Sequence, residues 1–92
     1  SGVGNHFFYL LAVGSGSSKW GDSPTCDSSK VKGIGNNKAG KIWYRALTKY
    51  MTSHTDYSGA RVATLSAAKD LYSESSTEYA TVAAAWSAVN VK

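Results

Sequence analysis

The chain has 92 residues, enough for one domain near the lower end of the size at which a single hydrophobic core is stable. Hydrophobic residues make up 42% of it and charged residues 17%, which excludes a disordered acidic or basic tail. Lys and Arg outnumber Asp and Glu by 10 to 6, and the net charge of +4 is too small to indicate nucleic-acid binding. We therefore expect a single domain over residues 1–92.

The first expected element is a helix over residues 2–13. Its second half, FFYLLAV, carries no charged residue, and a helix that is apolar on nearly every face is buried on every face. Four of its side chains would form a large apolar patch if they were exposed together: Phe7, Phe8, Leu10 and Leu11. We expect them to contact the missing part of a larger protein, and we expect the isolated chain either to self-associate or to bury them under its other helices.

Residues 14–35 form the expected loop between the first and second helices. This segment holds the single proline and much of the Gly and Ser, which is typical of a long surface loop, with a short hairpin as an alternative. It also holds Cys26, the single cysteine, which cannot form a disulfide within the chain. The sequence predicts either a free thiol or a disulfide with a cysteine elsewhere in a larger protein.

A second helix is expected from Asn36 or Asn37, either of which can cap it, to about Thr52. Apolar residues recur on one face at spacings of three and four: Ala39, Ile42, Trp43, Ala46, Leu47, Tyr50 and Met51. The opposite face is basic, with Lys38, Lys41, Arg45 and Lys49. Such a face could bind an acidic protein, a nucleic acid or a membrane surface, but a solvated helix face is the commoner explanation. Arg45 could also pair with a carboxylate.

Two further helices are expected in the second half of the chain. The third covers residues 58–72, with Asp56 or Ser58 as its cap, and the fourth starts at a capping box formed by Ser75 and Glu78. Asn90 suits a left-handed turn after the last helix. Because no segment alternates as a strand does, the predicted fold is all-α: a compact bundle of about four helices with a long loop between the first two.

The residues alone indicate no active site. The chain has no HExxH, Gly-x-Ser-x-Gly or phosphate-binding loop, and its candidate metal ligands His6, Cys26 and His54 lie on different segments. No apolar run approaches the roughly 20 residues of a membrane span. We therefore expect no catalytic residue, no metal ligand, no cofactor and no membrane partner for this chain.

Four segments, in order, resemble the C-terminal helical part of the thermolysin-like neutral zinc metalloproteases. They are SGVGNHFFYLLA, GIGNNKAGKIWYRALTKYMT, DYSGARVATLSAAKDLY and EYATVAAAWSAVNV. The resemblance covers nearly the whole chain apart from about residues 17–32, and GIG-x-x-K-A-x-K-I-x-Y-R-A-L-T is its most specific piece. These segments are most similar in sequence to the secreted actinomycete, or Streptomyces-type, members. Ser73 departs from the pattern, since Gly is common at that position, and so do Asn36-Asn37 and the longer loop containing Cys26.

The resemblance implies that the parent is a secreted, extracellular zinc endopeptidase that acts on proteins or peptides and carries calcium. In that family the catalytic, zinc and calcium residues precede the position that Ser1 matches, so none of them transfers to this chain. The chain would be a non-catalytic domain that scaffolds the active-site cleft together with an N-terminal catalytic part, and would be inactive in isolation. The alternative is an autonomous helical binding module that uses the basic face of residues 38–49.

Overall fold

The computed structural model describes residues 2–15 and 31–92. Cys26 and most of the loop around it lie outside the described residues. Those that are described form five helical elements: α1 (Gly2–Ala12), α2 (Asn36–Arg45), the π-helical η1 (Ala46–Tyr50), α3 (Tyr57–Leu71) and α4 (Thr77–Ala88). The sole strand-like pairing in this part of the chain is an isolated bridge between Gly14 and Lys32. The predicted all-α bundle is therefore confirmed.

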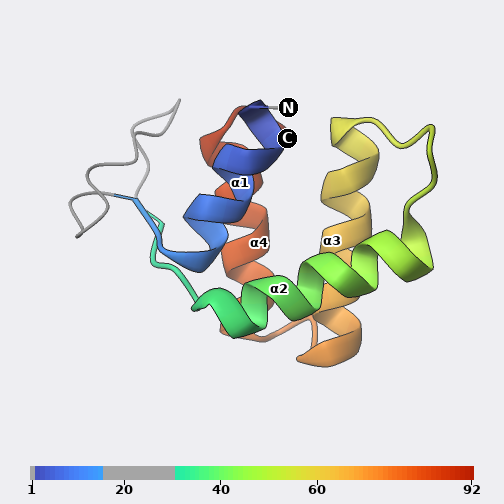
Figure 1. Ribbon diagram of the computed structural model, residues 1–92. Coiled ribbons are helices and arrows are strands. Elements are labelled where there is room, and N and C mark those ends of the chain that lie inside the picture. The colour runs from blue at the N-terminus through green and yellow to red at the C-terminus, as the bar shows by residue number, and fades with distance from the viewer. Residues whose placement is uncertain (1, 16–30) are drawn as a thin grey trace.

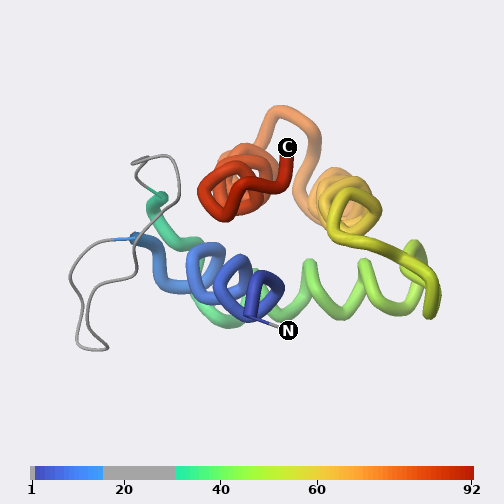
Figure 2. Tube along the Cα trace, turned by 90° about the horizontal axis from the view of Figure 1, so that it is seen from above, coloured from blue at the N-terminus to red at the C-terminus, as the bar shows by residue number. Residues whose placement is uncertain are grey.

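Helix α4 and the continuous pair α2–η1 each pack against both α1 and α3. Figures 1 and 2 show α1, α3 and α4 grouped side by side, with α2 and η1 running across them. Both α1 and α3 pack against α4 and against α2, and η1 packs against α3. Each helix thus covers part of another, which encloses one core in a molecule that measures 33 × 25 × 20 Å.

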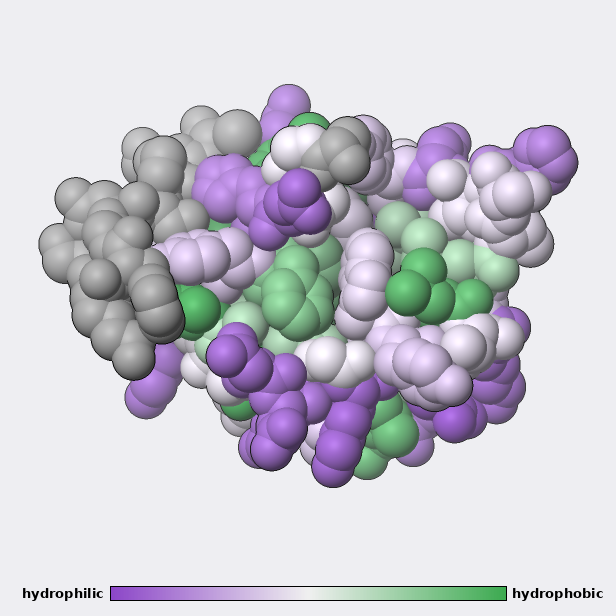
Figure 3. Space-filling model, viewed as in Figure 1, coloured by the Kyte–Doolittle hydropathy of each residue, from purple (hydrophilic) through white to green (hydrophobic). Residues whose placement is uncertain are grey.

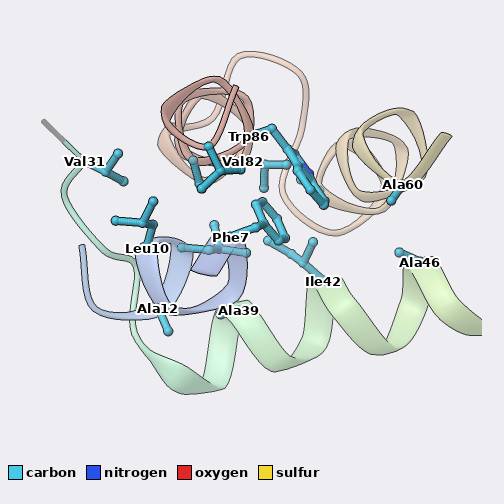
Figure 4. Close-up of a cluster of buried hydrophobic side chains, with 14 of the residues drawn as sticks. Phe7, Leu10, Ala12, Val31, Ala39, Ile42, Ala46, Ala60, Val82 and Trp86 are labelled. Carbon is cyan, nitrogen blue, oxygen red and sulfur yellow. The ribbon is translucent and has the colours of Figure 1, made fainter. Parts of the chain in front are cut away.

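The centre of the core is a stack of two aromatic rings. Phe7 of α1 lies flat on Trp86 of α4, with 3.8 Å between the ring centroids and 10° between the planes (Figure 4). The Trp86 indole N–H donates to the hydroxyl of Thr64 at 2.8 Å, and this hydroxyl in turn donates to the carbonyl of Ala60 at 2.8 Å. Trp86 and Thr64 are both fully buried, so every polar atom in this chain of bonds has a partner.

Helix α1 is buried on one face. Phe7, Leu10 and Leu11 are 0% exposed under the chain's own helices, whereas Phe8 is half-buried and Asn5 is exposed. The expectation of burial on every face is therefore wrong. Burial under the other helices, one of the two expected alternatives, describes three of the four large side chains.

The end of α1 is bonded to the approach to α2. The carbonyls of Leu11 and Ala12, which have no partner within the helix, accept the backbone N–H groups of Ile34 and Gly35 at 2.8 and 2.9 Å. A Cβ on Gly33 would lie 2.4 Å from the carbonyl carbon of Val13, so only glycine allows the two backbones to come this close. This contact holds the residues at the end of α1 against those just before α2.

The caps in the second half of the chain follow local chemistry, with one shift from the expected positions. Asp56, one of the two predicted caps, begins α3 and accepts the N–H of Gly59 at 2.8 Å. Helix α4 is capped by Ser76, which accepts the N–H of Tyr79 at 3.0 Å; the prediction of Ser75 is wrong by one residue because the Ser76 hydroxyl also donates to the Ser73 carbonyl. Asn90 has a φ of 66°, the left-handed conformation predicted for it.

The second helix also differs from prediction at both ends. Gly35 occupies its N-cap position without a side-chain bond, so neither Asn36 nor Asn37 caps it. Its last turn widens into η1, where the N–H of Met51 bonds to the carbonyl of Ala46 at 2.8 Å. A π-turn accommodates one more residue than an α-turn, and the spacing of apolar residues does not reveal it.

Replacement of Gly33 by alanine is expected to destabilise the fold by about 1–3 kcal/mol, because the new Cβ would overlap the backbone of α1. Urea denaturation followed by circular dichroism would measure the change. Gly40→Ala is the matched control: its Cβ would meet no atom within 4 Å, and alanine in a helix should stabilise by about 0.5–1 kcal/mol. Equal effects of the two substitutions would contradict the close approach at Gly33.

Replacement of Ser73 by glycine is expected to stabilise the fold. Ser73 has a φ of 120°, in the region that favours glycine, and relief of this strain is worth about 1–2 kcal/mol. The same denaturation experiment would measure it. Ser73→Ala removes the hydroxyl and keeps the Cβ, so it should give no gain; stabilisation by alanine as large as by glycine would show that the backbone is not strained there.

Candidate functional site

The two histidines and the carboxylates do not form a metal centre within residues 2–15 and 31–92. No group of three or more His, Cys, Asp or Glu side chains is placed there to hold an ion. His6 lies on α1 and His54 in the loop between η1 and α3, and Cys26 lies outside the described residues. The described residues therefore provide no group of ligands for the zinc or calcium that the resemblance implies for a parent enzyme.

Most of the predicted basic face is paired with acidic side chains of other helices. Lys38 Nζ lies 2.6 Å from Glu78 Oε2 at the start of α4, and Arg45 Nε lies 2.9 Å from Asp70 Oδ2 on α3. Lys49 Nζ lies 3.7 Å from the same Asp70 oxygen. Among the four basic residues, Lys41 has no carboxylate partner in the described part of the chain. The positive charge available to an acidic partner is thus smaller than the sequence suggests.

Asp70 on α3 accepts hydrogen bonds from two residues of α2 and η1 and forms an ion pair with a third. The Tyr50 hydroxyl donates to it, and Arg45 and Lys49 approach the same oxygen. The Tyr50 bond and then the Arg45 bond lower the pKa of Asp70, while the bond to Asp70 raises the pKa of Tyr50. The pairs are solvent-exposed, so screening keeps each one weak, but together they fix η1 against α3.

A second pair joins the beginnings of α2 and α4. The Lys38 ammonium lowers the pKa of the Glu78 carboxyl, and Glu78 raises the pKa of Lys38. Glu78 lies in the first turn of α4, where the helix dipole favours a negative charge. The pair borders an open hollow of about 630 Å³ beside the segment 31–34.

Arg61 holds the end of the chain, a role that its sequence position did not indicate. Its guanidinium donates to the carbonyls of Ala83 and Val91 at 3.0 and 2.9 Å and lies 3.3 Å from the Ser87 hydroxyl. A cation at the C-terminal end of a helix satisfies carbonyls and complements the dipole. The contact ties the residues after α4 to α3 and is structural.

A partly exposed apolar row follows one side of α2 and η1. Trp43, Leu47 and Met51 are spaced four residues apart, and Leu47 is 46% exposed. The spacing of apolar residues predicted all three in the inner stripe, but full burial within that stripe is confined to Ala39, Ile42 and Ala46. In Figure 3, apolar side chains gather in the middle of this view, with hydrophilic ones around them.

Aromatic side chains of the neighbouring helices flank the row. Phe8 of α1 meets Trp43 edge to face, with 6.4 Å between ring centroids. Tyr57 of α3 is 40% exposed and, together with Met51, lines a pocket of about 370 Å³. The exposed apolar surface thus extends across three helices. Within the described residues, no helix is both long enough and apolar enough to cross a membrane.

Comparison with known proteins confirms the resemblance. Residues 1–91 match the family model of the thermolysin metallopeptidase alpha-helical domain. The chain is 52% identical over 95 residues to the transglutaminase-activating metalloprotease of Streptomyces mobaraensis, a match that covers 99% of this chain and 12% of the relative. It is 43% identical over 91 residues to bacillolysin of Bacillus cereus and 42% identical over 91 residues to thermolysin of Alicyclobacillus acidocaldarius, in each case over 99% of this chain and 14% and 15% of the relative. The chain therefore belongs to the thermolysin metallopeptidase family, as its alpha-helical domain.

Proposed function

We propose that this chain is the non-catalytic helical domain of a secreted, zinc-dependent metalloendopeptidase. In the parent enzyme it supports one side of the active-site cleft, which it forms together with an N-terminal zinc-binding part. The family match over residues 1–91 carries the proposal, and the names of the matched relatives, metalloprotease and thermolysin among them, support the reaction class. The chain spans 12–15% of the length of these relatives, so activity on protein or peptide substrates belongs to the larger protein.

The contribution of the chain to catalysis is positional. Helix α1 is anchored through three fully buried side chains, Phe7, Leu10 and Leu11, and its last carbonyls are bonded to the approach to α2. A helix fixed in this way is a rigid support for the segment that precedes it in the parent, which by resemblance carries a catalytic histidine. Zinc and calcium belong to the parent on this proposal, with ligands supplied upstream.

The alternative of a binding module that uses the basic face of α2 has weaker support. Lys38, Arg45 and Lys49 are paired with Glu78 or Asp70, so attraction of an acidic partner would compete with ion pairs that already exist. Cys26 stays a prediction, as a free thiol or as one half of a disulfide to the rest of the parent.

A segment exchange tests the proposal. A chimera would carry this chain in place of the matched 95-residue segment of the Streptomyces mobaraensis metalloprotease. The isolated chain should bind no stoichiometric zinc and leave casein uncut, because a catalytic zinc needs three protein ligands and an open position. The chimera should bind zinc and cleave casein, as metal analysis and a casein assay would show.

Two results would contradict the proposed function. One is tight, stoichiometric zinc together with proteolysis in the isolated chain. The other is a folded chimera that neither binds zinc nor cleaves casein. The control is the unmodified relative, which should cleave casein in the same buffer.

A further inference from the structure

We propose that the contacts of Asp70 with Arg45, Lys49 and Tyr50 form an acid-sensitive latch. The carboxylate of Asp70 on α3 holds η1 and the residues that follow it, 51–56, against the bundle. Loss of its charge opens this part of the chain while the core around Trp86 stays folded. The latch goes beyond the proposed function and does not depend on it, because every contact that it uses lies within this chain.

The first argument is that three side chains converge on one oxygen. Arg45 Nε lies 2.9 Å from Asp70 Oδ2, and Lys49 Nζ lies 3.7 Å from the same atom. The Tyr50 hydroxyl donates to it as well. These three residues extend from the last residue of α2 to the last residue of η1. If the carboxylate lost its charge, Arg45 and Lys49 would be two like charges at a helical spacing at which they repel.

The second argument is that burial of side chains contributes little to the hold on η1. Of its five residues only the small Ala46 is buried, and the other four are exposed. Among residues 51–56, Met51 and Thr55 are half-buried and the others are exposed. The Thr48 hydroxyl donates to the Tyr44 carbonyl at 2.8 Å, a kind of bond to the preceding turn that weakens and bends helices. A segment with so few buried contacts can open locally while the core stays closed.

The third argument is the position of Asp70 in its own helix. It is the residue before Leu71, the last residue of α3. The helix dipole opposes a negative charge at this end, so a neutral residue would suit α3 better. The charge of Asp70 is therefore favourable through its partners on α2 and η1, not through the helix that carries it.

The other charged groups of α3, of α4 and of the turn between them have different surroundings. Glu78 on α4 is paired with Lys38 on α2. Lys69 and Glu74 line a separate hollow of about 210 Å³. Neither glutamate is among the groups that shift the pKa of Asp70. Asp70 is therefore the carboxylate whose titration acts on η1.

The direction of the pH dependence follows from the contacts. The bonds from Tyr50 and then from Arg45 lower the pKa of Asp70 below its ordinary value of 3.8. A carboxyl group whose pKa is lowered by folding stabilises the closed state above its ordinary pKa, and this contribution is lost as the pH falls through the folded value. The latch should therefore be closed near neutral pH and should open as the pH falls below 3.8.

The test is hydrogen–deuterium exchange of the chain, read by mass spectrometry and corrected for the intrinsic exchange rates. At about pH 6, Asp70→Asn should speed the exchange of residues 46–56 about tenfold and that of residues 82–88, around Trp86, by less than about twofold. Asparagine has nearly the shape of aspartate and can still accept the Tyr50 bond, so this variant removes the charge. Glu74→Gln removes the same charge from the turn after α3 and should leave both segments within about twofold of wild type.

A second variant and a change of pH give independent measurements. Tyr50→Phe keeps the ring and every charge, and loss of its bond should speed the exchange of residues 46–56 about threefold. Between about pH 5 and about pH 3 the corrected exchange of this segment should rise severalfold in wild type and stay constant in Asp70→Asn. His54, which lines a hollow with Tyr50, is present in both proteins, so its titration cannot produce the difference.

Three results would overturn the latch. One is unchanged exchange of residues 46–56 in either variant. Another is slower exchange in Asp70→Asn, which the helix dipole alone would cause. The third is loss of protection in residues 46–56 and 82–88 together, in a variant or in acid, because η1 would then open only when the whole domain unfolds.

Discussion

The contact on which the rest of the bundle depends is the stack of Phe7 on Trp86. It joins the first helix of the chain to the last, and the bond from the Trp86 indole to Thr64 adds α3. Large aromatic rings bury much apolar area, and a buried indole N–H without an acceptor would lose more free energy than one hydrogen bond contributes. The positions of α1, α3 and α4 are therefore set by one residue, Trp86, and the side chains that satisfy it.

The crossing of α2 over this group depends on backbone contact rather than on side chains. Bonds from Ile34 and Gly35 to the final carbonyls of α1 fix where α2 begins, and Gly33 permits the approach. Ion pairs from Lys38 and Arg45 then attach the length of α2 to α4 and α3. Two of the three basic side chains of α2, Lys38 and Arg45, are thus paired within the chain, while an apolar row beside them stays partly exposed.

On the proposed function, that distribution suits a domain that supports one side of a cleft. A cleft built between two parts needs each part to keep its shape, and a bundle whose charged side chains mostly pair with one another meets that need. The apolar side chains that internal packing leaves partly exposed on α1, α2 and α3 lie outside the core that holds the helices together.

Much of the secondary structure could be predicted from the chain alone. The periodicity of apolar residues located four helices to within a few residues, the side chain of Asp56 identified the start of α3, and Asn90 identified the turn after α4. These features arise from interactions within one or two helical turns, which neighbouring residues in the sequence specify. Family membership could also be predicted, because the quoted segments preserve their order and spacing over residues 1–91.

Long-range packing settled what those local patterns left open. The sequence placed Trp43 and Leu47 in one buried stripe with Ile42, yet only Ile42 is fully covered, because the width of the covered strip depends on how α1 and α3 lie across α2. It placed Arg45 on a basic face and allowed it a carboxylate partner, but it could not name that partner, Asp70, which lies 25 residues away in the chain. Helical spacing reports which residues share a face; which part of that face meets a neighbour, and which part stays open for another, depends on helices that are distant in sequence.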